Sequence, residues 1–147
     1  MEGYILAVCL SPSKGTKKNE VESARILDNW GIENDAHAGE GHRQVSLLPI
    51  EEINKMKVLL PELDHGDFAE NLVVKGIDTD NLRMGDRIVI GEEIVLEVTQ
   101  IGKECHFGCQ IQQLTGDCIM PKKGIFTKVV KGGMVSNNLT VRVETIF

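Results

Sequence analysis

Three of the chain's four cysteines lie within residues 105–118, in the stretch GKECHFGCQIQQLTGDC. Cys105 and Cys109 are four positions apart, so they would share one face if the segment is helical. A thiol at a helix N-terminus has a lowered pKa, because the helix dipole stabilises the thiolate. Lys103 and His106 would act in the same direction. The stretch therefore predicts a reactive thiolate, which can act as a nucleophile or bind a soft metal.

Three interpretations of the cysteine cluster stay open. Cys105, Cys109 and Cys118, with one histidine, would complete a tetrahedral zinc site. A persulfide carrier or another reactive thiol would need only one of them. The third interpretation is burial without chemistry, which suits Cys118 and also Cys9, since Cys9 falls in an apolar run. Disulfides are not expected, because the N-terminus lacks the features of a signal peptide.

A second polar group, in the stretch GIENDAHAGEGHRQ, contains Asp35, His37, His42 and Arg43. An acid and two histidines could bind a metal ion. The same residues could equally hold a loop together by hydrogen bonds. Motifs typical of phosphate-binding loops, dinucleotide-binding folds or serine hydrolases do not occur in the sequence.

The net charge of −6 argues against general nucleic-acid binding, but the charge is unevenly spread. Residues 118–143 contain no acidic side chain and five basic ones: Lys122, Lys123, Lys128, Lys131 and Arg142. This tract begins where the cysteine cluster ends. The adjacency suggests an anionic small ligand near the thiols, whereas the alternative is a solvated basic surface.

The length of 147 residues predicts one domain over residues 1–147. Apolar runs predict strands at 4–10, 44–48, 70–76, 87–91 and 93–101, and a hairpin over 134–147 that turns at Asn137-Asn138. Helices are predicted at 19–31 and 49–61. The pattern indicates an α+β, mostly β fold: an antiparallel, barrel-like sheet with two or three short helices.

No apolar run approaches the roughly 18 residues of a membrane span, so no membrane association is expected. We expect a cytoplasmic location, because the N-terminal residues lack the basic region of a signal peptide.

Four segments, in order along nearly the whole chain, resemble the MOSC domain, a family named for the C-terminal domain of molybdenum cofactor sulfurase. They are GIENDAHAG with RQVSLL, FAENLVVKGID, LRMGDRIVIGEEIVLEVTQIGKECH, and GDCIMPKKGIF. The last is similar to the continuation in small stand-alone bacterial members. The family implies a β-rich, barrel-like fold, which agrees with the pattern of strands.

The resemblance implies one key cysteine, which carries sulfur as a persulfide or binds the molybdenum of the cofactor. Aligned on EVTQ, that residue is Cys105, with Cys109 second and His106 beside them. Members with an Arg-Cys pair would favour Cys109, but Gly108 precedes it here. Metal ligation is expected from Cys105, Cys109 and Cys118. Residues expected to bind the anionic pterin cofactor are Arg43, Asn71, Lys122, Lys123, Lys128 and Lys131.

The implied function is a sulfur carrier or transfer domain for molybdopterin, with possible sulfurtransferase-type activity. The chain is too short to include the pyridoxal-phosphate desulfurase domain of the complete sulfurase. Sulfur would therefore come from a separate cysteine desulfurase, and a molybdoenzyme is the other expected partner. The alternatives are a non-enzymatic molybdopterin- or molybdenum-binding module and a zinc-stabilised structural domain.

Overall fold

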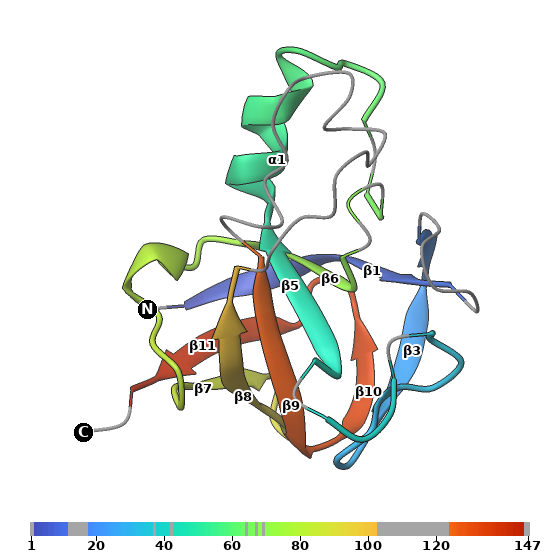
Figure 1. Cartoon of the computed structure of the whole chain (residues 1–147), viewed down its shortest axis with the longest axis vertical. Coiled ribbons are helices and arrows are strands. Elements are labelled where there is room, and N and C mark those ends of the chain that lie inside the picture. The colour runs from blue at the N-terminus through green and yellow to red at the C-terminus, as the bar shows by residue number, and fades with distance from the viewer. Residues whose placement is uncertain are drawn as a thin grey trace.

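The computed structural model describes residues 2–11, 18–36, 38–41, 43–63, 65–66, 68, 70–102 and 124–145 (Figure 1). Several predicted functional residues lie outside this set: Cys105, His106, Cys109, Cys118, Lys122 and Lys123, together with His37 and His42.

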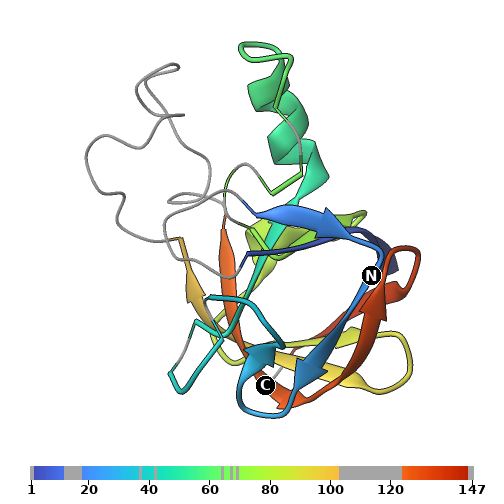
Figure 2. The same cartoon turned by 90° about the vertical axis from the view of Figure 1, so that its right-hand side faces the viewer.

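The main sheet is a closed barrel. Its strands run in the order β11-β7-β8-β9-β5-β6-β1, and β11 also pairs with β1, which joins the two ends; β2 extends the sheet beyond β1. The bounds are β1 (Glu2–Leu10), β2 (Asn19–Val21), β5 (Val45–Pro49), β6 (Leu72–Lys75), β7 (Arg87–Ile90), β8 (Ile94–Ile101), β9 (Ile125–Lys131) and β11 (Thr140–Glu144). Figure 2 shows these strands arranged as a ring. Closure leaves the barrel strands with few free edges.

A smaller sheet lies against the barrel. It consists of β3 (Ser23–Leu27), β4 (Gly31–Ile32) and β10 (Gly133–Ser136), in the order β10-β3-β4. Every second side chain of this sheet is buried with the barrel interior, as the alternation of a half-buried strand requires. Ala24, Ile26, Ile32 and Val135 all belong to the main hydrophobic core.

A second hydrophobic cluster lies between the outer face of the barrel and α1 (Ile50–Lys57). The helix contributes Ile50, Ile53 and Met56, which recur at helical spacing on one face. Acidic residues occupy its first turn and basic residues its last, an arrangement that complements the helix dipole. The barrel contributes Leu48 and Val73, whose neighbours in sequence face the interior.

The prediction of a mostly β, barrel-like fold is confirmed, as are the five predicted strands and the helix after Pro49. The helix predicted over 19–31 is wrong. That segment forms β2, β3 and a turn, because Ala24 and Ile26 alternate with exposed neighbours at the period of a strand. Among the described residues there is one α-helix and one short 3₁₀ helix (η1, Thr79–Asn81), not two or three α-helices.

The sheet is also not wholly antiparallel, since β5 and β6 pair in parallel. The chain leaves β5 through α1 and returns in the same direction, as a crossover connection does. The predicted turn at Asn137-Asn138 exists, and Asn138 adopts a left-handed φ of 72°. The flanking strands do not form a hairpin, because β10 pairs with β3 whereas β11 pairs with β1 and β7.

The helices of the described residues are too short to span a membrane.

Truncation of Leu48, which is 0% exposed in the second cluster, tests how α1 is held to the barrel. We expect Leu48→Ala to lower the free energy of unfolding by about 2–5 kcal/mol, since it leaves a cavity between helix and sheet. Leu59→Ala is the matched control, because Leu59 is 62% exposed and its loss should cost under about 0.5 kcal/mol. Urea unfolding measures both, and equal losses would contradict this packing.

Candidate functional site

Five residues form a lateral row across adjacent strands β8, β9, β5, β6 and β1. In register, Gln100 of β8 lies opposite Phe126 of β9, which lies opposite Ser46 of β5. Asn71, just before β6, bonds to Ser46, and its carbonyl accepts from the backbone N–H of Cys9 on β1 at 2.7 Å. We call these five residues the site row. Cys9 and Phe126 belong to the cluster beneath α1, so the row lies on the outer face of the barrel.

Asn71 is the centre of the site row and is 0% exposed. Its Oδ1 accepts from the Ser46 backbone at 3.0 Å and from the Ser46 hydroxyl at 3.3 Å. Its Nδ2 donates to the carbonyl of Cys9 at 3.1 Å, and its side chain also bonds to Asp35. One amide therefore joins β5, β1 and the loop after β4.

A buried ion pair adjoins the row. Lys18 Nζ lies 2.6 Å from Asp35 Oδ1, and both side chains are 0% exposed. The same Asp35 oxygen accepts from the backbone N–H of Ser11 at 3.1 Å. Ser11 and Lys18 flank residues 12–17, so the pair ties both ends of that segment to the loop after β4.

The ion pair determines the ionisation of Asp35. Burial alone would raise the pKa of this carboxyl, but hydrogen bonds from Lys18 and the Ser11 backbone, with the charge of Lys18, hold the pKa below its ordinary value. Asp35 is therefore a carboxylate at neutral pH and serves as the counter-ion of Lys18.

Glu70 and Gly66 fix the backbone of Lys18, whereas Asp35 binds its side chain. The Glu70 carboxylate is 0% exposed and accepts from the backbone N–H groups of Gly66 at 3.0 Å and Phe68 at 3.1 Å. Gly66 in turn accepts from the backbone N–H of Lys18 at 2.9 Å. Only glycine permits this approach, because a Cβ there would lie 2.0 Å from the Lys18 carbonyl oxygen and φ is +90°. Burial raises the pKa of Glu70, and the two N–H groups offset only part of this.

Arg43 lies at the other end of the site row. Its Nε donates to Gln100 Oε1 at 2.9 Å, and its guanidinium sits 5.3 Å from the centre of the Phe126 ring. The side chain is exposed, and no described residue takes its two Nη groups. Arg43 is thus a fixed cation with hydrogen-bond donors open to an anionic ligand.

Arg43 also marks the base of the segment that carries the cysteine cluster. The backbone N–H of Gly102, after β8, donates to the carbonyl of Gly124, before β9, at 2.7 Å. The two residues that flank 103–123 are therefore neighbours at this end of β8 and β9. The two side chains that contact Arg43, Gln100 and Phe126, each lie two positions from those points.

The predicted cofactor-binding residues are only partly brought together. Arg43 and Asn71 lie at the site row. Lys128 is two positions beyond Phe126 on β9 and pairs with Glu97 at 3.3 Å. Lys131 ends β9, about 16 Å along the strand from Phe126 at roughly 3.3 Å per residue. The remaining predicted site residues lie outside the described ranges, so their roles stay predictions.

Within the described part of the chain, no group of three or more histidine, cysteine or acidic side chains could hold a metal ion. Asp35, the acid of the metal site considered above with His37 and His42, forms an ion pair with Lys18. At the site row, the described residues supply the guanidinium of Arg43 with its open hydrogen-bond donors, an arrangement suited to binding an anion.

Several site residues could not be found from the sequence. Lys18 is one of three lysines in SPSKGTKK, and nothing in that loop distinguishes it. Ser46 and Phe126 lie in largely apolar strands, and Gln100 lies near the end of a strand that alternates apolar and polar residues. Three further site residues could be found from the order of the family motifs along the chain: Asp35 lies in GIENDAHAG, Ser46 in RQVSLL and Asn71 in FAENLVVKGID.

Comparisons with known families and solved structures agree with the fold. The sequence model of the MOSC domain matches residues 34–143. Among solved structures, the YuaD protein from Bacillus subtilis is similar with a TM-score of 0.82 at 18% identity, over 100% of this chain and 98% of that one. YiiM from Escherichia coli is similar with a TM-score of 0.68 at 20% identity, over 98% of this chain and 71% of that one. YiiM from Geobacillus stearothermophilus has a TM-score of 0.69 at 16% identity, over 95% and 74%. The comparison with curated proteins found no match.

Removal of one member of the buried ion pair should be costly. We expect Lys18→Met to lower the free energy of unfolding by about 3–5 kcal/mol, because Asp35 would remain buried without a counter-charge. The double variant Lys18→Met/Asp35→Asn keeps an acceptor for Ser11 and should recover much of the loss. Urea unfolding of both proteins gives the comparison. A double variant no more stable than the single one would contradict the charge argument.

The stability of the protein should also depend on pH through Asp35. Its folded pKa lies below the ordinary 3.8, so its contribution is complete above about pH 3.8 and is lost as pH falls through the folded pKa. Glu70 acts oppositely: its folded pKa is raised above 4.5, so its contribution is complete below that pH and declines as pH rises through the folded pKa. Urea unfolding from about pH 7 to about pH 2.5 measures the sum.

The double variant Lys18→Met/Asp35→Asn isolates the Asp35 part, because Glu70 titrates in both proteins and cancels in the difference. We expect the advantage of the unmodified chain over this variant to shrink on the acid side only. An advantage that is constant across the acid range would show that Asp35 has an ordinary pKa.

Proposed function

Because the chain belongs to the MOSC-domain family, we propose that it acts in molybdenum cofactor metabolism, with Cys105 as the thiol that carries persulfide sulfur or binds molybdenum. The family is linked to the molybdenum cofactor. The observation that carries the proposal is that two motif segments, far apart in the sequence, meet in one polar cluster: Asp35 and Ser46 come from the first, and Asn71 from FAENLVVKGID. Ser46 of this cluster lies opposite Phe126, two positions from Gly124, which follows the segment that contains Cys105.

Arg43 is proposed to bind the phosphate of the pterin. Its planar guanidinium suits a phosphate. The hydrogen bond to Gln100 uses only Nε, and the contact with Phe126 is made over the face of the ring, so the two Nη groups remain available to a ligand. Lys128 is partly neutralised by Glu97, and Lys131 lies far along β9. We therefore give Arg43 the leading role, with Lys122, Lys123, Lys128 and Lys131 as a supporting positive field.

Asn71 is proposed to position the site rather than to contact the ligand. Its amide is wholly buried and already bonded to Ser46, Cys9 and Asp35. An amide in this state holds the strands in register. The proposed ligand contacts are thus left to Arg43 and to the segment after Gly102.

The proposed sulfur step is a thiol–disulfide type exchange. The Cys105 thiolate attacks the outer sulfur of a persulfide on a cysteine desulfurase. A sulfur–sulfur bond forms on Cys105 as the donor's sulfur–sulfur bond breaks, and the donor cysteine leaves as a thiolate. No external oxidant or reductant is needed. The cofactor, when bound, would supply the metal centre that takes the sulfur.

Mass spectrometry tests the assignment of the key thiol. After anaerobic incubation with a cysteine desulfurase and cysteine, we expect the full chain to gain the mass of one sulfur atom, mapped to the peptide that contains Cys105. Cys105→Ser should abolish the gain, whereas the matched controls Cys109→Ser and Cys118→Ser should keep it.

Sulfur that stays on Cys109 in the Cys105→Ser protein would move the role to Cys109. No adduct on any cysteine, together with bound pterin, would favour a non-enzymatic binding module. Stoichiometric zinc with unfolding on chelation would instead indicate the structural zinc domain.

A further inference from the structure

Strand β10 has an open edge. It pairs with β3 on one side, and no described strand pairs with it on the other. The Arg25 carbonyl of β3 accepts from Glu33, so the backbone groups of Ala24 and Ile26 are the ones directed to β10. Their partners are Val135 and Gly133. The backbone groups of Met134 and Ser136 therefore face away from β3, as the groups of an edge strand do.

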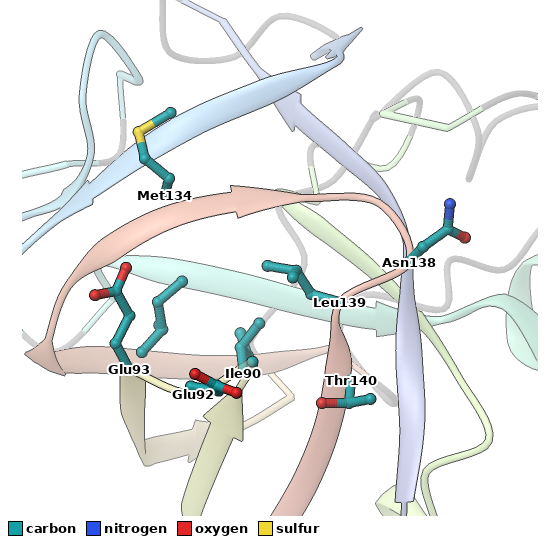
Figure 3. Close-up of a pocket in the computed structure, with 9 residues that line it drawn as sticks. Ile90, Glu92, Glu93, Met134, Asn138, Leu139 and Thr140 are labelled. Atoms are coloured by element: carbon teal, nitrogen blue, oxygen red, sulfur yellow. The ribbon is translucent and has the colours of Figure 1, made fainter.

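A hollow of about 800 Å³ adjoins this edge. It lies between β10, the β7–β8 turn and the start of β11, and its apolar lining comes from Ile90, Ile94 and Leu139. Figure 3 shows Leu139 pointing into the hollow from beneath β10 and Glu93 rising toward the strand. The hollow is large enough for an apolar side chain of an added strand.

Met134 stands where this hollow meets two smaller ones. It lines all three, and its side chain is 49% exposed in spite of its apolar character. Methionine is the residue type that adapts best to varied apolar partners. An exposed methionine on an open strand edge is therefore suited to protein contact.

The rims of the three hollows are acidic. Glu92 and Glu93 border the first, Asp28 the second and Glu33 the third, whereas Arg25 is the only basic residue among the described lining residues. Lysine and arginine side chains on a bound segment would meet opposite charges along this edge.

We propose that the open edge of β10 and the adjoining hollow bind an extended basic segment of a partner protein. The segment adds a strand beside Met134 and Ser136, inserts one apolar side chain over Leu139, and places basic side chains against Glu92 and Glu93. This surface is separate from the site row: Ile94 borders the hollow and Gln100 belongs to the row, about 20 Å apart along β8 at roughly 3.3 Å per residue.

Peptide titration of the isotope-labelled full chain, followed by amide NMR shifts, tests the proposal. The probe is a synthetic hexapeptide of alternating lysine and valine. We expect saturable shifts confined to residues 91–94 and 134–140. A lysine–serine hexapeptide should bind at least about fivefold more weakly, since it has no apolar side chain for the hollow. A glutamate–valine hexapeptide should cause no shift.

Charge variants test the acidic rim. Glu92→Gln/Glu93→Gln should weaken binding of the lysine–valine peptide about threefold to tenfold. Glu62→Gln is the matched control, because Glu62 is exposed after α1 and lines none of the three hollows, so its loss should leave the affinity unchanged. Equal binding of the three peptides, shifts spread over the acidic surface, or no shift would overturn the proposal. Concentration-dependent shifts at the same amides without peptide would assign the edge to a second copy of the chain and overturn it too.

Discussion

The buried amide of Asn71 is the interaction on which the candidate site depends. It bonds to Ser46 on β5, to the Cys9 carbonyl on β1 and to Asp35 after β4, at a position from which water is excluded. An unpaired polar group at such a position would cost about 1–3 kcal/mol, so a slip of one strand past another would be penalised at several bonds together. The amide thereby fixes the register of the strands that bring the motif segments together.

The ion pair of Lys18 and Asp35 extends this network beyond the barrel. Burial of two charges is expensive, and such pairs are weak evidence for stability. The position of the pair is fixed by its surroundings. Gly66 lies close to the backbone of Lys18, and the carboxylate of Glu70 accepts a hydrogen bond from the backbone N–H of Gly66. Ser11 and Lys18, which flank residues 12–17, are thus both bonded to Asp35, which is itself bonded to Asn71. We interpret the pair as a device for position rather than for stability.

The parts of the fold that depend on local hydrophobic periodicity could be predicted from the sequence. The parts of the site that depend on pairing between distant segments could not. Apolar runs predicted β1, β5 and β8 correctly, and Pro49 with two acidic residues predicted α1. The helix predicted over 19–31 was wrong because the few apolar positions of this segment fit both a helix and two short strands. The pairing of β3 with β10, which the sequence pattern does not reveal, favours the strands. The parallel pairing of β5 with β6 and the partner of Asp35 are likewise set by distant segments. Motif order predicted the family, but not that the motifs would converge on Asn71.

Strand β8 joins the two surfaces for which roles are proposed. Its first residue, Ile94, borders the hollow beside β10, and Gln100 near its other end holds Arg43. β8 pairs with β7 over Ile94–Glu97 and with β9 over Val95–Ile101, inside a closed barrel. Energetic coupling between distant sites requires an element with two states. Because β8 is paired within the closed barrel, we expect a partner bound at the β10 edge to act through the reach of its own chain, which raises its local concentration near the site row, rather than through a change of geometry at Arg43.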